Sequence, residues 1–157
     1  GIREMFNNVP DIHAAIAKMM EQNSEFKKQV EDYARKAALQ AAETLREKAE
    51  KVGNLNVIRF TMTQNPQTVR EIAIIISKIT TDTVFAAAFE SGGKPSLVLA
   101  YSENLAASGK NAGKDIREAA KFIQGGGGGQ PQIATAGGRD VSGLANALEA
   151  LVDIATK

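Results

Sequence analysis

The distribution of apolar and polar residues divides the chain into a helical first third and a mixed remainder. Residues 11–52 contain no Gly or Pro and are rich in Ala, Glu, Lys and Gln, which are strong helix formers. Asn8 and Pro10 suit the start of a helix, and Gly53 with Asn54 suits its end. We therefore expect one helix of about forty residues, roughly 60 Å long.

Along this helix, mostly apolar positions follow one another at alternating steps of four and three, the 3.5-residue period of a left-handed coiled coil. Because a small globular body cannot cover so long a helix, we expect this seam to need a partner and assign it to oligomerisation. A helix packed lengthwise on its own domain is the alternative. Asn23 either fixes the register of a pair or is solvated where the seam opens. The seam positions are Ile12, Ile16, Met19, Asn23, Phe26, Val30, Tyr33 and Ala37.

From residue 54 onward, strand-like and helix-like patterns alternate. A two-residue period predicts a strand at 56–62, and apolar runs predict strands at 83–90 and 96–102, with a hairpin turn at 91–94 and a short strand at 133–136. A helical period predicts helices at 65–80, at 105–124 with a break at Gly109, and from Asp140 or Ser142 to Ile154. The predicted fold class is α+β, with a long N-terminal, coiled-coil-like helical arm (1–53) followed by a compact α/β domain with a mixed sheet (54–157).

A run of five glycines, Gly125 to Gly129, follows the helix predicted to end at residue 124. Composition alone suggests a flexible linker. We favour a loop where backbone closely approaches a ligand or a partner, because Gly137 and Gly138, an expected tight turn, form a second pair nearby. The run is not a P-loop, since Gln130 and Pro131 stand where Lys and Ser or Thr would be needed. It is not a dinucleotide fingerprint either, since it follows a helix.

Positive charge is concentrated in one segment of the chain. The whole chain has 19 Lys and Arg against 18 Asp and Glu, whereas residues 104–139 hold five basic and two acidic residues, a local charge of +3. The first four basic residues are spaced by 4, 3 and 4 positions, so we expect them to line one helix face. Both a solvated stripe and a phosphate-contacting surface fit this pattern. The five are Lys110, Lys114, Arg117, Lys121 and Arg139.

The nearest aromatic residues to this basic segment, Phe122 and Tyr101, are expected in the core. That argues against stacking on single-stranded bases and favours recognition of backbone and shape.

Composition excludes several chemistries. Without cysteine there is no disulfide scaffold, thiolate nucleophile or zinc–thiolate site, and His13 alone cannot supply a catalytic triad or a multi-histidine metal site. The carboxylates are scattered, so we expect no catalytic residue, metal or cofactor in this chain. Because no apolar run reaches membrane-spanning length and no signal peptide is recognisable, we expect a cytoplasmic protein without a membrane partner.

Residues 110–113 and 123–140 together resemble the C-terminal module of the alanyl-tRNA synthetase (alanine–tRNA ligase) family, a member of the DHH-associated domain family. The family pattern is a glycine run, Arg-Pro, a short spacer, Ala-Gln-Ala-Gly-Gly, a basic residue and Asp, then a closing helix. Gln130 stands where Arg is usual, and Thr135 where Gln is usual. The first departure removes a potential phosphate contact.

The resemblance implies a homodimeric module that binds the tRNA for alanine at its elbow, where the D and T loops meet. It would support aminoacylation and editing by domains outside this chain, which would use ATP, magnesium and zinc. The module itself would hold no cofactor. From the local charge of +3 together with this resemblance, we expect the nucleic-acid contacts to come from the basic residues, the glycine run and Gln130, with the glycines facing either the nucleic acid or a dimer mate. The expected nucleic-acid-binding residues are Lys110, Lys114, Arg117, Lys121, Gly125, Gly126, Gly127, Gly128, Gly129, Gln130 and Arg139.

Two alternatives stay open. A purely structural oligomerisation module would use the seam and leave the basic face solvated. The same domain family also occurs in DHH phosphoesterases, where a histidine follows the glycine run and helps to bind substrate. Gln130 occupies that place here and no Asp-His-His motif exists, so the phosphoesterase interpretation is disfavoured.

Overall fold

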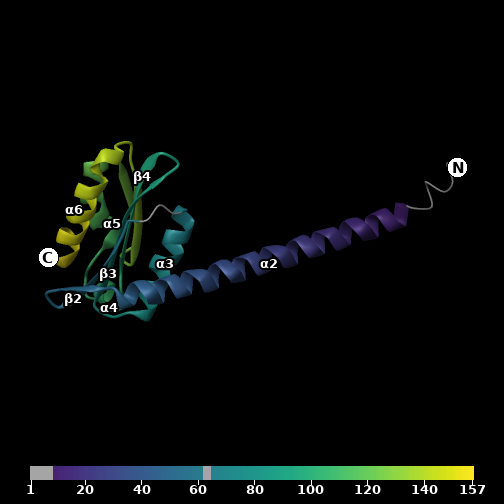
Figure 1. Ribbon diagram of the computed structural model, residues 1–157, viewed down its shortest axis with the longest axis horizontal. Coiled ribbons are helices and arrows are strands. Elements are labelled where there is room, and N and C mark those ends of the chain that lie inside the picture. Colours follow the sequence, from purple (N-terminus) through teal and green to yellow (C-terminus); the bar gives the residue numbers. More distant parts are fainter. Residues whose placement is uncertain (1–8, 62–64) are drawn as a thin grey trace. The chain divides into compact units, whose positions relative to one another are not determined.

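The computed structural model describes residues 9–61 and 65–157 (Figure 1). The chain divides into two compact units, Gly1–Ala37 and Ala38–Lys157. Helix α2 (Val9–Glu47) forms the described part of the first unit and the first residues of the second. The predicted cap at Asn8 and the predicted strand end at Met62 lie outside the described residues. None of the helices in the described ranges combines the length and the hydrophobicity that a bilayer span requires.

The second unit contains a six-stranded mixed sheet in the order β1-β2-β3-β4-β6-β5, in which β2 and β3 are parallel and the other neighbours antiparallel. This confirms the predicted α+β class. The strands are β1 (Glu50–Val52), β2 (Leu55–Phe60), β3 (Thr83–Ser91), β4 (Lys94–Tyr101), β5 (Gly126–Gly129) and β6 (Ile133–Gly137). The helices are α3 (Pro66–Ile79), α4 (Glu103–Ala107), α5 (Ala112–Ala120) and α6 (Leu144–Thr156), with 3-10 turns η1 (Lys121–Ile123) and η2 (Val141–Gly143).

Helices cover both faces of the sheet (Figure 1). On one face, α5 and α6 pack over alternate residues of β4, including Leu97 and Leu99. On the other face, α3 and the last turns of α2 pack over Val98 and Ala100. Strand β3 is buried on both faces, which explains why it reads as a continuous apolar run rather than as an alternating one.

Asparagine caps start the two helices that flank the glycine strand. The Asn65 side chain accepts a hydrogen bond from the Gln67 amide at 2.9 Å, and Asn111 accepts one from the Lys114 amide at 3.1 Å. The predicted start of α3 is confirmed. The predicted break at Gly109 is also confirmed, since that residue has a φ of 113° between α4 and α5.

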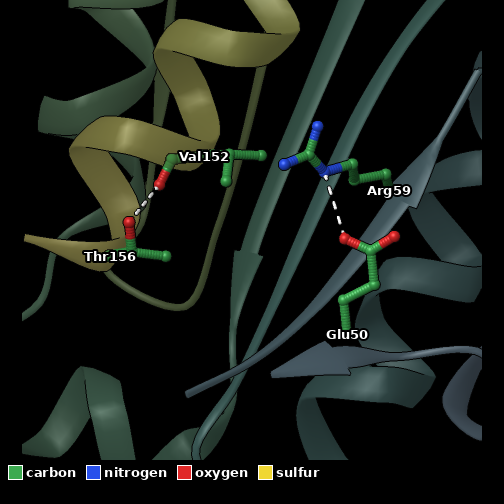
Figure 2. Close-up of polar contacts among 4 residues, drawn as sticks. All are labelled: Glu50, Arg59, Val152 and Thr156. Atoms are coloured by element: carbon green, nitrogen blue, oxygen red, sulfur yellow. Dashed lines mark hydrogen bonds and ion pairs between the residues drawn. The ribbon is translucent and has the colours of Figure 1, made fainter. Parts of the chain in front are cut away.

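The predicted end of the first helix was wrong. Helix α2 ends at Glu47, and Glu50–Val52 forms β1, which pairs with β2 across a turn at Gly53. The Glu50 carboxylate and the Arg59 guanidinium join these strands at 3.9 Å (Figure 2). The sheet edge therefore takes residues that helical propensity alone assigns to the helix. Ala38 and Ala42 are buried in the second unit, so this unit includes the end of α2.

The predicted start of the last helix also needs correction. Asp140 caps η2, where its carboxylate accepts from the Ser142 amide at 3.1 Å, and α6 begins only at Leu144. At the other end of α6, the Thr156 hydroxyl donates to the Val152 carbonyl at 2.7 Å (Figure 2).

The glycine run is a strand, so the predicted loop at 125–129 was wrong. Gly126–Gly129 form β5, which pairs antiparallel with β6 at the edge of the sheet. Gly137, expected in a tight turn, ends β6 opposite Gly126. The amide of Gln130 donates to the Ile133 carbonyl at 2.9 Å and closes the hairpin. Glycine has low strand propensity, so only the tertiary pairing reveals this strand.

We expect Asn111→Ala to lower the free energy of unfolding by about 1 kcal/mol, because the Lys114 amide loses its cap. Urea denaturation measures this change. Asn146→Ala is the control, since that residue is exposed within α6 and should be neutral. Equal stability of the two variants would contradict the capping role of Asn111.

Candidate nucleic-acid interface

Strand β5 lies so close to its neighbours that side chains cannot be added at alternate positions. A Cβ atom on Gly125, Gly127 or Gly129 would lie 2.0–2.5 Å from a backbone oxygen of β6. A Cβ atom on Gly113 of α5 would lie 2.5 Å from the Gly129 oxygen. These distances are well below van der Waals contact. The glycines therefore allow α5, β5 and β6 to pack backbone against backbone.

The remaining glycines of the hairpin face open space or a cation. A Cβ atom on Gly126 would meet nothing within 4 Å, and one on Gly137, its partner in the register, would meet only the Pro95 oxygen at 3.9 Å. A Cβ atom on Gly128 would lie 3.3 Å from the guanidinium of Arg117. At Gly126 and Gly137, therefore, packing within the chain does not require the absence of a side chain.

Three of the predicted basic residues follow α5 and η1. Arg117 lies against β5, where its Nε donates to the Gly127 oxygen at 3.4 Å. Lys114 is exposed in the first turn of α5, where the helix dipole disfavours a cation. Lys121 is exposed and its ammonium lies 3.3 Å from the Glu118 carboxylate. Exposed pairs of this kind contribute little to stability, so Lys121 stays available to a polyanion.

Lys110 does not share this helix face, so that prediction was wrong. It precedes α5 in the non-helical link after Gly109, and its side chain turns inward. The ammonium lies 5.5 Å from the centroid of the Tyr101 ring and donates to the Ala155 carbonyl near the end of α6. Lys110 thereby connects β4 to α6.

Asp115 is also engaged within the protein. The buried phenol of Tyr101 donates a hydrogen bond to its carboxylate. Burial and this carboxylate raise the pKa of Tyr101, so the phenol stays protonated as a donor. Among the described residues, no three His, Cys, Asp or Glu side chains gather where they could hold a metal ion.

Of the two aromatic residues expected in the core, Tyr101 is buried, as predicted, whereas Phe122 is 49% exposed. Phe122 lies in η1 next to Lys121. A Cβ atom on Gly143 would lie 1.8 Å from the carbonyl oxygen of Phe122. The backbone of Phe122 therefore packs tightly against η2 while its ring stays accessible.

Two grooves border the glycine hairpin and contain basic residues that the sequence did not single out. A groove of about 460 Å³ brings Arg70 of α3 beside Gly129 and Gln130. A groove of about 660 Å³ holds Arg139 together with Lys94, the first residue of β4. Arg70 and Lys94 are distant in sequence from the glycines. The strand order, which places β4 next to β6, is what brings Lys94 there, and the packing of α3 on the sheet is what brings Arg70 there.

The predicted seam of α2 is exposed along its whole length. Each of its eight positions is accessible to solvent, with Phe26 63% and Tyr33 77% exposed. Met20 adds a further apolar side chain that is 68% exposed. A continuous row of this kind is typical of a surface that binds another protein.

The globular part of the chain matches a known family. The model of the DHHA1 domain family matches residues 54–157. Two alanine–tRNA ligases are similar over 155 residues, or 98% of this chain: that of Bacteroides thetaiotaomicron is 41% identical and that of Bacteroides fragilis 39%. The chain spans only 18% of the length of each of these relatives.

The crystal structure of the C-Ala domain from Aquifex aeolicus alanyl-tRNA synthetase is similar in fold, with a TM-score of 0.63 and 27% sequence identity. The similarity covers 69% of this chain and 98% of that domain.

We expect Gly127→Ala to destabilise the protein by roughly 1–3 kcal/mol or more, because its Cβ atom would overlap β6. Gly126→Ala should change the free energy of unfolding by less than about 0.5 kcal/mol, because its Cβ atom would point into open space. Chemical denaturation of the two variants measures both values. Equal stability would show that β5 does not pack as a strand against β6.

Proposed function

The chain belongs to the DHHA1 domain family, and from that premise we propose that it is the RNA-binding and self-associating module of an alanine–tRNA ligase. The observation that carries the RNA-binding part is the convergence of cations on the glycine hairpin. Arg70 comes from α3, Arg117 from α5 and Arg139 from the segment after β6. The names of the similar ligases supply the class of RNA, the tRNA for alanine.

Phosphate recognition follows from the kinds of side chain at this surface. Arg117 offers a guanidinium fork directly beside the strand, and Lys114 and Lys121 extend the positive charge along α5 and η1. Because β5 has no side chains, a sugar–phosphate backbone can approach it closely. Phe122 offers one accessible ring, so most of the interface recognises backbone and shape rather than stacked bases.

Lys110 is proposed to contribute differently from the other predicted cations. Its ammonium is held against Tyr101 and the end of α6, so it positions α5 instead of reaching the RNA. In this proposal the ATP-dependent ligase reaction and its metal ions belong to other parts of the ligase.

Self-association is assigned to the exposed seam of α2. Ile16 and Val30 occupy equivalent positions of the heptad, with Asn23 between them. β-Branched residues at these positions favour two-stranded coiled coils, and a buried Asn at the same position fixes the register. We therefore propose a homodimer in which Asn23 faces its counterpart.

We expect the chain to bind the tRNA for alanine with an affinity that falls steeply with salt, as about three to five phosphate contacts require. Lys114→Glu, Arg117→Glu and Lys121→Glu together should weaken binding and flatten the slope of log affinity against log salt by about three. Fluorescence anisotropy across a salt series measures both. The matched control is Lys48→Glu, Lys51→Glu and Lys78→Glu, three exposed lysines elsewhere in the second unit.

Two outcomes would contradict the RNA-binding part. If the unchanged chain fails to bind tRNA at low salt, the module does not bind RNA. If the α5 reversals leave tRNA affinity unchanged while the protein stays dimeric, the purely structural oligomerisation module is the better account.

We expect Ile16→Asp with Val30→Asp to convert the dimer to a monomer, because two charges would be buried in the seam. Multi-angle light scattering reports the mass. Ala14→Asp with Lys28→Asp is the control, since these residues lie on the opposite side of the helix. A variant pair at the seam that remains dimeric would place the interface elsewhere.

A further inference from the structure

The groove that holds Arg139 is built from segments that are distant in the sequence. It is lined by the end of β3, the start of β4, residues 124–125 just before the glycine strand, and the end of β6 with the two residues that follow it, together with Pro66. None of the cations of α5 lines it. The groove is therefore separate from the α5 surface, although both border the same glycine hairpin.

The sheet register brings two cations together at this groove. Ser96 of β4 pairs with Gly137 of β6, and the Gly138 amide donates to the Pro95 carbonyl at 3.2 Å, which extends the pairing by one residue. Lys94 is the next residue along β4, and Arg139 follows Gly138 beyond the end of β6; both are exposed. Like charges in one groove repel each other, so this arrangement costs stability unless an anion lies between them.

Nothing among the described residues neutralises this pair. In residues 9–61 and 65–157, neither Lys94 nor Arg139 forms an ion pair, and no carboxylate lines the groove. The adjacent Asp140 carboxylate accepts hydrogen bonds from the amide and the hydroxyl of Ser142 instead. The groove thus presents uncompensated positive charge, which favours a polyanionic ligand.

The groove lacks the free amides of a compact phosphate cradle. The amide of Gly125 donates to the Ala120 carbonyl at 3.0 Å, and that of Gly138 is bonded to Pro95. The charge therefore comes from two long side chains beside a wall that includes Gly125, Gly137 and Gly138, which have no side chains. Such a surface suits an extended phosphodiester chain better than a single phosphate ion.

We propose that this groove is a second contact for the RNA backbone, in which Lys94 and Arg139 bind phosphates that the α5 surface does not reach. The proposal rests on the RNA-binding function proposed above and adds Lys94 to the interface. The RNA backbone then crosses the glycine hairpin and is held on both sides of it.

Binding of a transcript of the tRNA for alanine across a salt series tests this proposal with the whole chain. Lys94→Gln with Arg139→Gln should lower affinity by about eightfold per cation at 0.1 M salt and flatten the salt slope by about two. The control is Lys78→Gln, an exposed lysine near the other end of α3, about 18 Å along that helix from Pro66. Thermal unfolding should show that all three proteins are equally folded or, for the groove variant, slightly more stable.

The outcomes separate this proposal from the proposed function. If the groove variant binds like the unchanged chain while Lys114→Gln with Arg117→Gln binds more weakly, the groove is not a contact and the α5 surface still is. If neither set changes affinity, both proposals fail. If Lys78→Gln weakens binding as much as the groove variant, the effect is one of net charge and the groove proposal is overturned.

A second measurement does not depend on charge. Because the chain has no cysteine, Ser91→Cys places a unique thiol at the edge of the groove, and Ser108→Cys places one outside it. The transcript should slow alkylation of the thiol at position 91 and leave that at 108 unaffected. Equal alkylation at position 91 with and without bound RNA would overturn the proposal, and so would equal slowing by inorganic phosphate at the same phosphate concentration.

Discussion

The close approach of α5, β5 and β6 is the constraint on which the rest of the interface depends. Three backbones meet at distances that leave no room for a methyl group at Gly113, Gly125, Gly127 or Gly129. Because the helix sits directly on the edge strand, Arg117 can reach a glycine carbonyl of β5. On its other side β6 pairs with β4, and this pairing brings Arg139, beyond the end of β6, into one groove with Lys94. Replacing these glycines would move the cations as well as the strand.

Some charged side chains near this surface are bonded within the protein, whereas others stay exposed, and the net charge of the chain does not reveal this difference. Asp115 is bonded to the buried Tyr101 phenol, and Lys110 is held at the end of α6. These two side chains of opposite charge thus form contacts within the protein. Arg117 and Arg139 come from the same basic segment but lie against the glycine hairpin. A chain with a formal net charge of only +1 can in this way present a strongly positive local surface.

Much of the fold follows from the sequence because local and tertiary preferences agree there. Asn65 and Pro66 mark the start of α3, and the apolar runs mark β3 and β4, where hydrophobic period and burial coincide. The glycine strand could not be predicted, because glycine carries no periodicity and only pairing with β6 makes it a strand. Helical propensity likewise predicted that the first helix includes residues 50–52, because only their pairing with β2 across the turn at Gly53 makes them a strand. In the candidate site, Lys94 was missed because its place beside the glycines depends on strand order, and Arg70 was missed because its place depends on how α3 packs on the sheet.

Amide hydrogen exchange across the glycine run tests the central claim most directly, that this segment is an ordered strand that fixes the cationic surface. Nuclear magnetic resonance of the chain labelled at glycine and glutamine resolves these amides. The account predicts slow exchange at Gly125 and Gln130, whose amides donate to the Ala120 and Ile133 carbonyls, together with protection of the amides that β5 directs at β6. Exchange of all these amides at the rate of an unstructured chain would contradict it.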